Sequence, residues 1–137
     1  MSFMPRALRK APILLSALTL IFAAGCHSYH IEATVENRTG GSVTLLEVDY
    51  PSASFGVDTL AADGTVRHRI QIRDSGPITV QYVGPHGRQI QVKGPVLYEK
   101  QEGSINIVLL PDGKAEFHTA LDPFSVPASN PASTPKS

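Results

Sequence analysis

Apolar and polar residues alternate with a period of two in one segment after another between residues 29 and 121. In the first of these segments the apolar positions are Tyr29, Ile31, Ala33 and Val35. Successive side chains of a β-strand point to opposite faces of its sheet, so this alternation is typical of a half-buried strand. No segment between 29 and 121 repeats its apolar residues at helical spacing. The pattern therefore predicts an all-β domain over residues 29–121.

The segment 43–50 breaks the simple alternation once. Val43 and Leu45 share one parity of the strand, and from Leu46 onward the apolar residues fall on the other parity. A β-bulge places one extra residue in a strand and would return both sets to the same face. We therefore predict a bulge at Leu45 and Leu46 that directs both sets into the core.

Turn sequences rich in glycine, proline and aspartate separate the remaining strands. The segment with Phe55 and Val57 follows Pro51, which lacks the N–H that a central strand must donate, so this segment is expected at a sheet edge. Further alternating segments occupy residues 66–72, 78–82, 90–92, 105–109 and 115–117. The turn sequences 84–87 and 111–113 are expected to join the last four of these segments into two hairpins.

Seven or eight short strands at intervals of about 8–12 residues predict one antiparallel β-sandwich of the immunoglobulin-like kind. The number of strands depends on residues 94–103, which fit either a strand or a long loop. True immunoglobulin domains pack a Trp against a Cys pair between the sheets. This chain has one Cys and no Trp, so the likeness is expected in architecture alone.

Residues 1–25 have the three-part layout of an export signal. A basic stretch contains Arg6, Arg9 and Lys10, and small residues close the segment before Cys26. The apolar run between them, residues 13–24, is 12 residues long, whereas a helix that crosses a bilayer needs about 20. We therefore predict a helical signal peptide rather than a permanent transmembrane helix.

The end of this signal, Phe22-Ala23-Ala24-Gly25-Cys26, resembles the lipobox of bacterial lipoproteins, although Ala23 stands where Leu is usual. The resemblance implies that the signal is cut before Cys26, that the Cys26 thiol carries a diacylglycerol, and that the new amino group is acylated. An ordinary signal cut after Gly25 fits the same small residues. Two or more acyl chains anchor a protein stably, so residues 26–28 are expected to form a lipid-anchored N-terminus.

The same resemblance bears on the location of the protein. His27 follows Cys26 in place of Asp, which in Gram-negative lipoproteins favours the outer membrane. We therefore expect a cell-envelope protein on the outer membrane, facing the periplasm. Asn37 to Gly41 form a turn sequence that loosely resembles those of small envelope lipoproteins, a likeness that carries no activity with it.

The charge balance excludes one class of partner. The chain has 12 Lys and Arg residues and 12 Asp and Glu residues, so it lacks the basic surplus of a nucleic-acid-binding protein. Removal of residues 1–25 leaves nine basic and 12 acidic residues, a formal net charge of −3. Attachment to an anionic membrane surface is then expected to depend on the lipid rather than on basic residues.

Residues 122–137 form a Pro/Ser-rich repeat in which proline recurs every fourth residue, at Pro123, Pro127, Pro131 and Pro135. Proline removes backbone donors and the other residues are too polar to build a core, so a disordered tail is expected. Such a tail fits a solvated end, a spacer or a ligand for a partner's groove.

Three arginines are the strongest candidates for a binding surface. Arg67, Arg69 and Arg73 share one parity of their segment, and the polar parity of a later segment holds Gln89, Gln91 and Lys93. If the two strands are neighbours, their outer face forms a basic, amide-rich patch that suits an anionic or glycan ligand. The alternative is the solvated outer face that antiparallel sheets commonly present.

Neither a metal site nor a catalytic site is predicted. His27 and His30 are three residues apart, a spacing that places them on opposite faces of a strand, and His68, on the apolar side of its strand, fits a position in the core or at its rim. The chain lacks the Gly-x-Ser-x-Gly, His-Glu-x-x-His and phosphate-binding loop patterns. We therefore expect no cofactor and no enzymatic activity.

Together these features predict a membrane-anchored envelope lipoprotein that acts as a structural or protein-interaction module. Its partners would be the lipid bilayer, through acylated Cys26, and an envelope protein or glycan. The alternative prediction is a binder of an anionic or glycan ligand through Arg67, Arg69 and Arg73.

Overall fold

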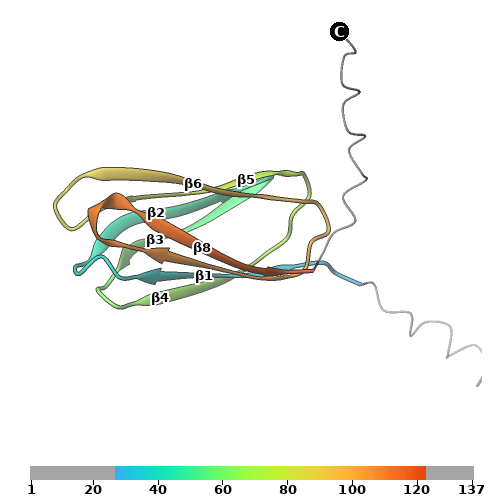
Figure 1. The fold of residues 1–137 in the computed structure, drawn as a ribbon, viewed down its shortest axis with the longest axis horizontal. Helices are drawn as coiled ribbons and strands as arrows, with labels where there is room; N and C mark the ends of the chain where they lie inside the picture. The colour runs from blue at the N-terminus through green and yellow to red at the C-terminus, as the bar shows by residue number, and fades with distance from the viewer. Residues whose placement is uncertain (1–26, 123–137) are drawn as a thin grey trace, which may run out of the picture.

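The computed structural model describes residues 27–122, which fold into two packed four-stranded sheets (Figure 1). The first sheet contains, in spatial order, β4 (Thr65–Ile70), β1 (Ile31–Asn37), β7 (Gly103–Leu109) and β8 (Ala115–Leu121). The second sheet contains β3 (Ala53–Leu60), β2 (Val43–Tyr50), β5 (Gly76–Val83) and β6 (Gln89–Leu97). The predicted all-β sandwich is confirmed. The signal peptide, Cys26 and the tail beyond Asp122 lie outside the described residues.

Neighbouring strands are antiparallel with one exception, the pair of β1 and β7. These two strands run parallel from the pairing of Ile31 with Gly103 to that of Asn37 with Leu109. The strand order also differs from that of immunoglobulin domains, in which the first, second, fifth and fourth strands share a sheet. The likeness is therefore one of architecture, as the missing Trp and Cys pair suggested.

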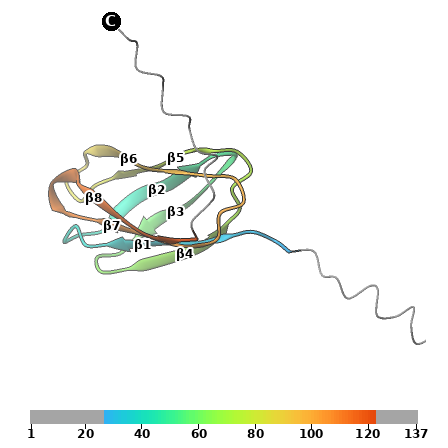
Figure 2. The ribbon, with the colours of Figure 1, turned by 45° about the vertical axis from the view of Figure 1, so that its right-hand side comes forward.

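The two sheets face each other (Figure 2), and one hydrophobic core lies between them. In β1 every second residue is buried, and Ile31, Ala33 and Val35 are each 0% exposed. The largest fully buried side chains from the other strands include Leu46, Ile70, Ile78, Tyr82, Leu97, Ile105, Ile107 and Leu109. The period-two alternation in the sequence thus marked the inward face of the strands correctly.

The predicted bulge in β2 is present. The register with β5 shifts between Thr44 and Glu47, and Leu45 has a φ of 50°. Val43 and Leu46 are buried on either side of it, whereas Leu45 is 67% exposed. The expectation that Leu45 would also reach the core is wrong, because the extra residue of a bulge is the one that leaves the ladder.

The predicted edge strand and hairpins are also confirmed. The strand β3 lies at one edge of its sheet, and β5–β6 and β7–β8 are antiparallel pairs joined by short turns. The ambiguous segment 94–103 divides between three elements: β6 continues to Leu97, residues 98–102 form a loop, and β7 begins at Gly103. The sandwich therefore has eight strands. No helix within residues 27–122 is long and apolar enough to span a membrane.

The two ends of the sandwich differ in what they carry. The first strand, β1, begins at Ile31 and the last, β8, ends at Leu121, and both residues are paired with Gly103 at one end. Four turns, residues 38–42, 61–64, 84–88 and 110–114, lie at the opposite end, on the left in Figure 1. We call this the distal end.

A buried asparagine holds the distal end together. Asn37, at the end of β1, is 0% exposed, and its Nδ2 donates to the carbonyl oxygens of Gly41, Leu60 and Ala61 at 2.8, 2.9 and 3.0 Å. Its Oδ1 accepts from the amide and the hydroxyl of Thr39. Buried polar groups must find hydrogen-bond partners, and here one side chain supplies them to two turns and to both sheets.

Replacement of Asn37 by Ala is expected to lower the free energy of unfolding by about 3 kcal/mol, because buried carbonyl groups lose their donor. Asn106→Ala is the matched control, since the half-buried Asn106 side chain lies on the outer face of the first sheet, where its Nδ2 donates to Glu36 and its Oδ1 has no partner among residues 27–122. The control should cost about 1 kcal/mol. Urea unfolding followed by circular dichroism measures both values, and equal losses would contradict the assignment.

Candidate functional site

The three arginines that the sequence suggested as a binding surface lie at the edge of the first sheet, and all are exposed. Arg67 and Arg69 project from β4 on its outer face, and Arg73 follows the end of that strand. On the neighbouring strand β1, Arg67 is paired with Thr34 and Arg69 with Glu32. The Nε of Arg69 donates to Oε1 of Glu32 at 3.1 Å. The arginine row thus borders an acidic strand.

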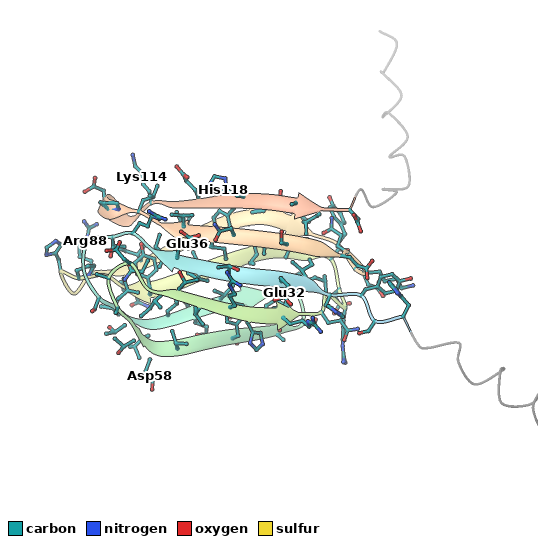
Figure 3. The ribbon with its side chains drawn as sticks, turned by 90° about the horizontal axis from the view of Figure 1, so that it is seen from below. Glu32, Glu36, Asp58, Arg88, Lys114 and His118 are labelled. Atoms are coloured by element: carbon teal, nitrogen blue, oxygen red, sulfur yellow. The ribbon has the colours of Figure 1, made fainter. Side chains whose placement is uncertain are left out.

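The rest of this outer face carries carboxylates and a histidine, of which Figure 3 shows Glu32, Glu36 and His118. Glu36 accepts hydrogen bonds from Asn106 at 2.9 Å and from Arg38 at 3.1 Å. The hydrogen bond from Asn106, and next the one from Arg38, lower the pKa of Glu36 below its usual range. An anion on this face would therefore meet carboxylates as well as guanidinium groups.

The composite basic, amide-rich patch expected from the sequence does not form. Gln89, Gln91 and Lys93 belong to β6, which pairs with β5 at the edge of the second sheet. The arginine strand β4 pairs with β1 in the first sheet. The patch required the two strands to be neighbours. That expectation is wrong, because the long-range pairing places them in different sheets.

The histidines have separate local partners. The Nε2 of His27 lies 2.7 Å from Oε1 of Glu102. His68 stacks on Phe55 of the second sheet, with ring centroids 4.6 Å apart and an interplanar angle of 19°. This contact across the sheet edges is the rim position expected for His68. Within residues 27–122, no three His, Cys, Asp or Glu side chains gather as metal ligands do.

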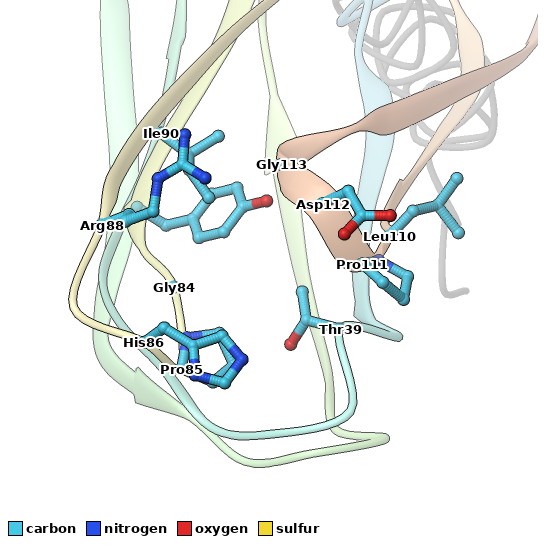
Figure 4. Close-up of a pocket in the computed structure, with 11 residues that line it drawn as sticks. Thr39, Gly84, Pro85, His86, Arg88, Ile90, Leu110, Pro111, Asp112 and Gly113 are labelled. Atoms are coloured by element: carbon cyan, nitrogen blue, oxygen red, sulfur yellow. The ribbon is translucent and has the colours of Figure 1, made fainter.

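A pocket of about 160 Å³ opens at the distal end (Figure 4). Its walls come from the β5–β6 turn, the β7–β8 turn and Thr39 of the β1–β2 turn. Sequence reasoning missed this site, because its residues lie in turns whose spatial proximity depends on strand pairing. The one local signal was the occurrence of two charged residues, Arg88 and Asp112, in turns at the same end of consecutive hairpins.

Tyr82 contributes the buried polar group of this pocket. It lies near the end of β5 with its ring directed inward and is 1% exposed. Its hydroxyl has no hydrogen-bond partner among the described residues. Burial raises the pKa of the Tyr82 phenol above its ordinary value, so the hydroxyl stays protonated and able to donate. An unpartnered buried hydroxyl costs stability, and a polar group that hydrogen-bonded to it would remove this cost.

Two opposite charges stand on either side of the opening. Figure 4 shows Arg88 and Asp112 on opposite sides of the pocket, with His86 and Thr39 between them at the rim. Both charged side chains belong to exposed residues, and neither forms an ion pair within the described part of the chain. Each is therefore available to a ligand.

Two glycines in the wall of the pocket occupy positions where a side chain would be crowded or strained. A Cβ atom on Gly84 would lie 3.2 Å from Cδ1 of Ile90, and Gly113 has a φ of +74°. L-residues rarely adopt such a positive φ, and Asp112 before it has a φ of 67°. The tight turn Pro111–Gly113 thereby brings the Gly113 backbone close to Ile90 of β6.

The comparisons with known proteins support the fold and nothing beyond it. No family model matches the chain, and no curated protein matches it in sequence. Among solved structures, the chain is similar to the NMR structure of a protein from Eubacterium rectale, with 14% sequence identity and a TM-score of 0.50. The likeness covers 69% of this chain and 93% of that chain. At this identity it shows a shared fold alone.

The parity of β4 yields a stability prediction. Ile70 is 1% exposed, so Ile70→Ala should cost about 2–5 kcal/mol through lost burial and the cavity that remains. Arg67→Gln, on the outer face of the same strand, should change stability by no more than about 0.5 kcal/mol. Urea unfolding of both variants tests the assignment, which a large loss in Arg67→Gln would overturn.

The buried phenol yields a pH prediction. Because the folded state raises the pKa of Tyr82 above 10.0, the fold favours the neutral phenol, and its contribution to stability is complete below pH 10 and lost as pH rises further. Tyr82→Phe should lie within about 1 kcal/mol of the wild type at pH 7. Above pH 10 the wild type should lose stability relative to this variant.

Unfolding curves between pH 8 and pH 11 measure this difference. Tyr29→Phe is the control, because it removes the hydroxyl of an exposed ring. A wild type that follows Tyr82→Phe in parallel over the whole range would show that the Tyr82 hydroxyl is accessible to solvent.

Proposed function

We propose that this chain is an exported envelope lipoprotein whose β-sandwich serves as an interaction module, held on the outer membrane through acylated Cys26 and facing the periplasm. The proposal combines the lipobox-like sequence with one observation about the fold. His27, the residue after Cys26, contacts Glu102 just before β7, and the four turns of the distal end lie at the opposite end of the sandwich.

This arrangement orients the domain. A strand of seven residues such as β1 spans roughly 23 Å at about 3.3 Å per residue. A lipid on Cys26 would place the end with His27 and Leu121 against the bilayer, and the distal end would face away from it. Loops on a rigid scaffold commonly carry binding function. The distal end is therefore the surface that we assign to partner contact.

The arginine face supports binding less well. Arg69 is paired with Glu32, and Glu36 lies on the same outer face, although Arg67 and Arg73 form no ion pair within residues 27–122. The pocket at the distal end, in contrast, combines a buried hydroxyl that lacks a partner with two charges that lack one. A binding function for the domain thus finds its support at the distal end rather than at Arg67, Arg69 and Arg73.

The anchor is tested by replacing Cys26 with Ser in the full chain. The variant should incorporate no labelled fatty acid and should accumulate as uncut precursor, because the thiol is the acceptor of the lipid. A second variant, Cys26→Ser with Ser28→Cys, keeps one thiol in the same region two residues later and should also remain unlabelled. Normal labelling of either variant, followed by mass spectrometry of the N-terminal peptide, would contradict the proposal.

A further inference from the structure

The size of the distal pocket limits its ligand to about one ring. The pocket holds about 160 Å³, which is close to the roughly 150 Å³ of an engineered cavity that admits benzene. A six-membered ring therefore fits, whereas pockets that enclose drug-sized molecules are larger, typically about 300–1,000 Å³. Any larger ligand would have to insert one terminal unit.

The charges at the opening limit the ligand further. Arg88 offers only hydrogen-bond donors and ionised Asp112 offers only acceptors. A simple anion is attracted by Arg88 but repelled by Asp112. A simple cation is attracted by Asp112 but repelled by Arg88. A neutral molecule with several hydroxyl groups satisfies both, because each hydroxyl donates and accepts.

The groups inside the pocket also suit a ligand that carries hydroxyl groups. The Tyr82 hydroxyl lacks a partner and is buried, so a ligand hydroxyl that bonds to it would remove the cost of leaving it unpaired. Ile90 and Pro111 add apolar surface beside it, which suits the C–H face of a saturated ring. The pocket is thus part polar and part apolar, as a pyranose is.

From these three features we infer that the distal pocket binds a single neutral pyranose, as a free monosaccharide or as the terminal unit of a glycan. The inference rests on the proposed function, because it names a ligand for the same distal end. It uses none of the arginine-face residues.

The test is a titration of the full, isotope-labelled chain in detergent, followed by two-dimensional ¹H–¹⁵N NMR. The probes are the methyl glycosides of glucose, galactose, mannose and N-acetylglucosamine. Saturable shifts are expected at the amides of Gly84 and Gly113, which line the pocket, and none at Gly56, which lies on β3. Glucuronate, glucosamine and free alanine serve as an anionic, a cationic and a zwitterionic comparison.

Variants then assign the contacts. Tyr82→Phe removes only the unpartnered hydroxyl and should weaken binding of the best glycoside about fivefold, as expected for one lost hydrogen bond. Arg88→Gln and Asp112→Asn should each weaken it similarly. Asp58→Asn, an exposed change on β3, should leave it unchanged. If all three pocket variants bind as the wild type does, the site is elsewhere and the inference is overturned.

Two other results would also overturn it. One is the absence of saturable shifts at Gly84 and Gly113 with all four glycosides. The other is tighter binding of glucuronate, glucosamine or alanine than of every neutral sugar, which would assign the pocket to a charged ligand. Free and glycan-linked sugars are distinguished by whether an oligosaccharide that ends in the best unit competes with the free glycoside. Labelling of Cys26 is measured separately, so failure of the ligand and failure of the anchor are distinguishable.

Discussion

The distal end of the sandwich depends on the hydrogen bonds of one buried side chain, Asn37. Two N–H groups of its amide serve three carbonyl oxygens, one of which belongs to Leu60 in the opposite sheet. Its own backbone adds bonds to Gly64 and Asp63 at 2.9 Å. A buried amide with all its groups satisfied favours one arrangement of the surrounding turns, because any other arrangement leaves polar groups without partners. The arrangement of the turns 38–42 and 61–64 at the distal end therefore depends on Asn37.

The same hydrogen-bond network holds part of the pocket wall in place. The Thr39 hydroxyl at its rim donates to Oδ1 of Asn37 at 2.7 Å. Gly41 in the same turn packs so close to Pro85 that a Cβ atom there would lie 2.8 Å from the proline ring. The β1–β2 turn is thus held against the β5–β6 turn. This contact matters for binding, because a pocket whose walls are already positioned loses less entropy when a ligand enters.

The outer face of the first sheet and the distal end differ in whether their charged residues have ion-pair partners. On the outer face of the first sheet, Glu32 and Glu36 are paired with Arg69 and Arg38, so both of these carboxylates have a cationic partner. At the distal end Arg88 and Asp112 have no such partners within residues 27–122. An anchor at Cys26 would make this division useful, since it would keep the paired face lateral and direct the unpaired groups away from the bilayer.

Local pattern determined the strands, their inward faces, the bulge at Leu45 and the hairpin turns, because each depends on side-chain alternation or turn chemistry within a few residues. It also drew attention to Cys26, which lies outside the described residues. The parallel pairing of β1 with β7, the placement of β4 and β6 in different sheets, and the approach of three turns around Tyr82 were decided only by the tertiary structure. These features join residues far apart in the chain, and a period-two pattern says which face of a strand is buried but not which strand lies beside it. For the same reason the arginines were visible in the sequence as a row, whereas the pairing of Arg69 with Glu32, and the pocket that lies apart from this row, were not.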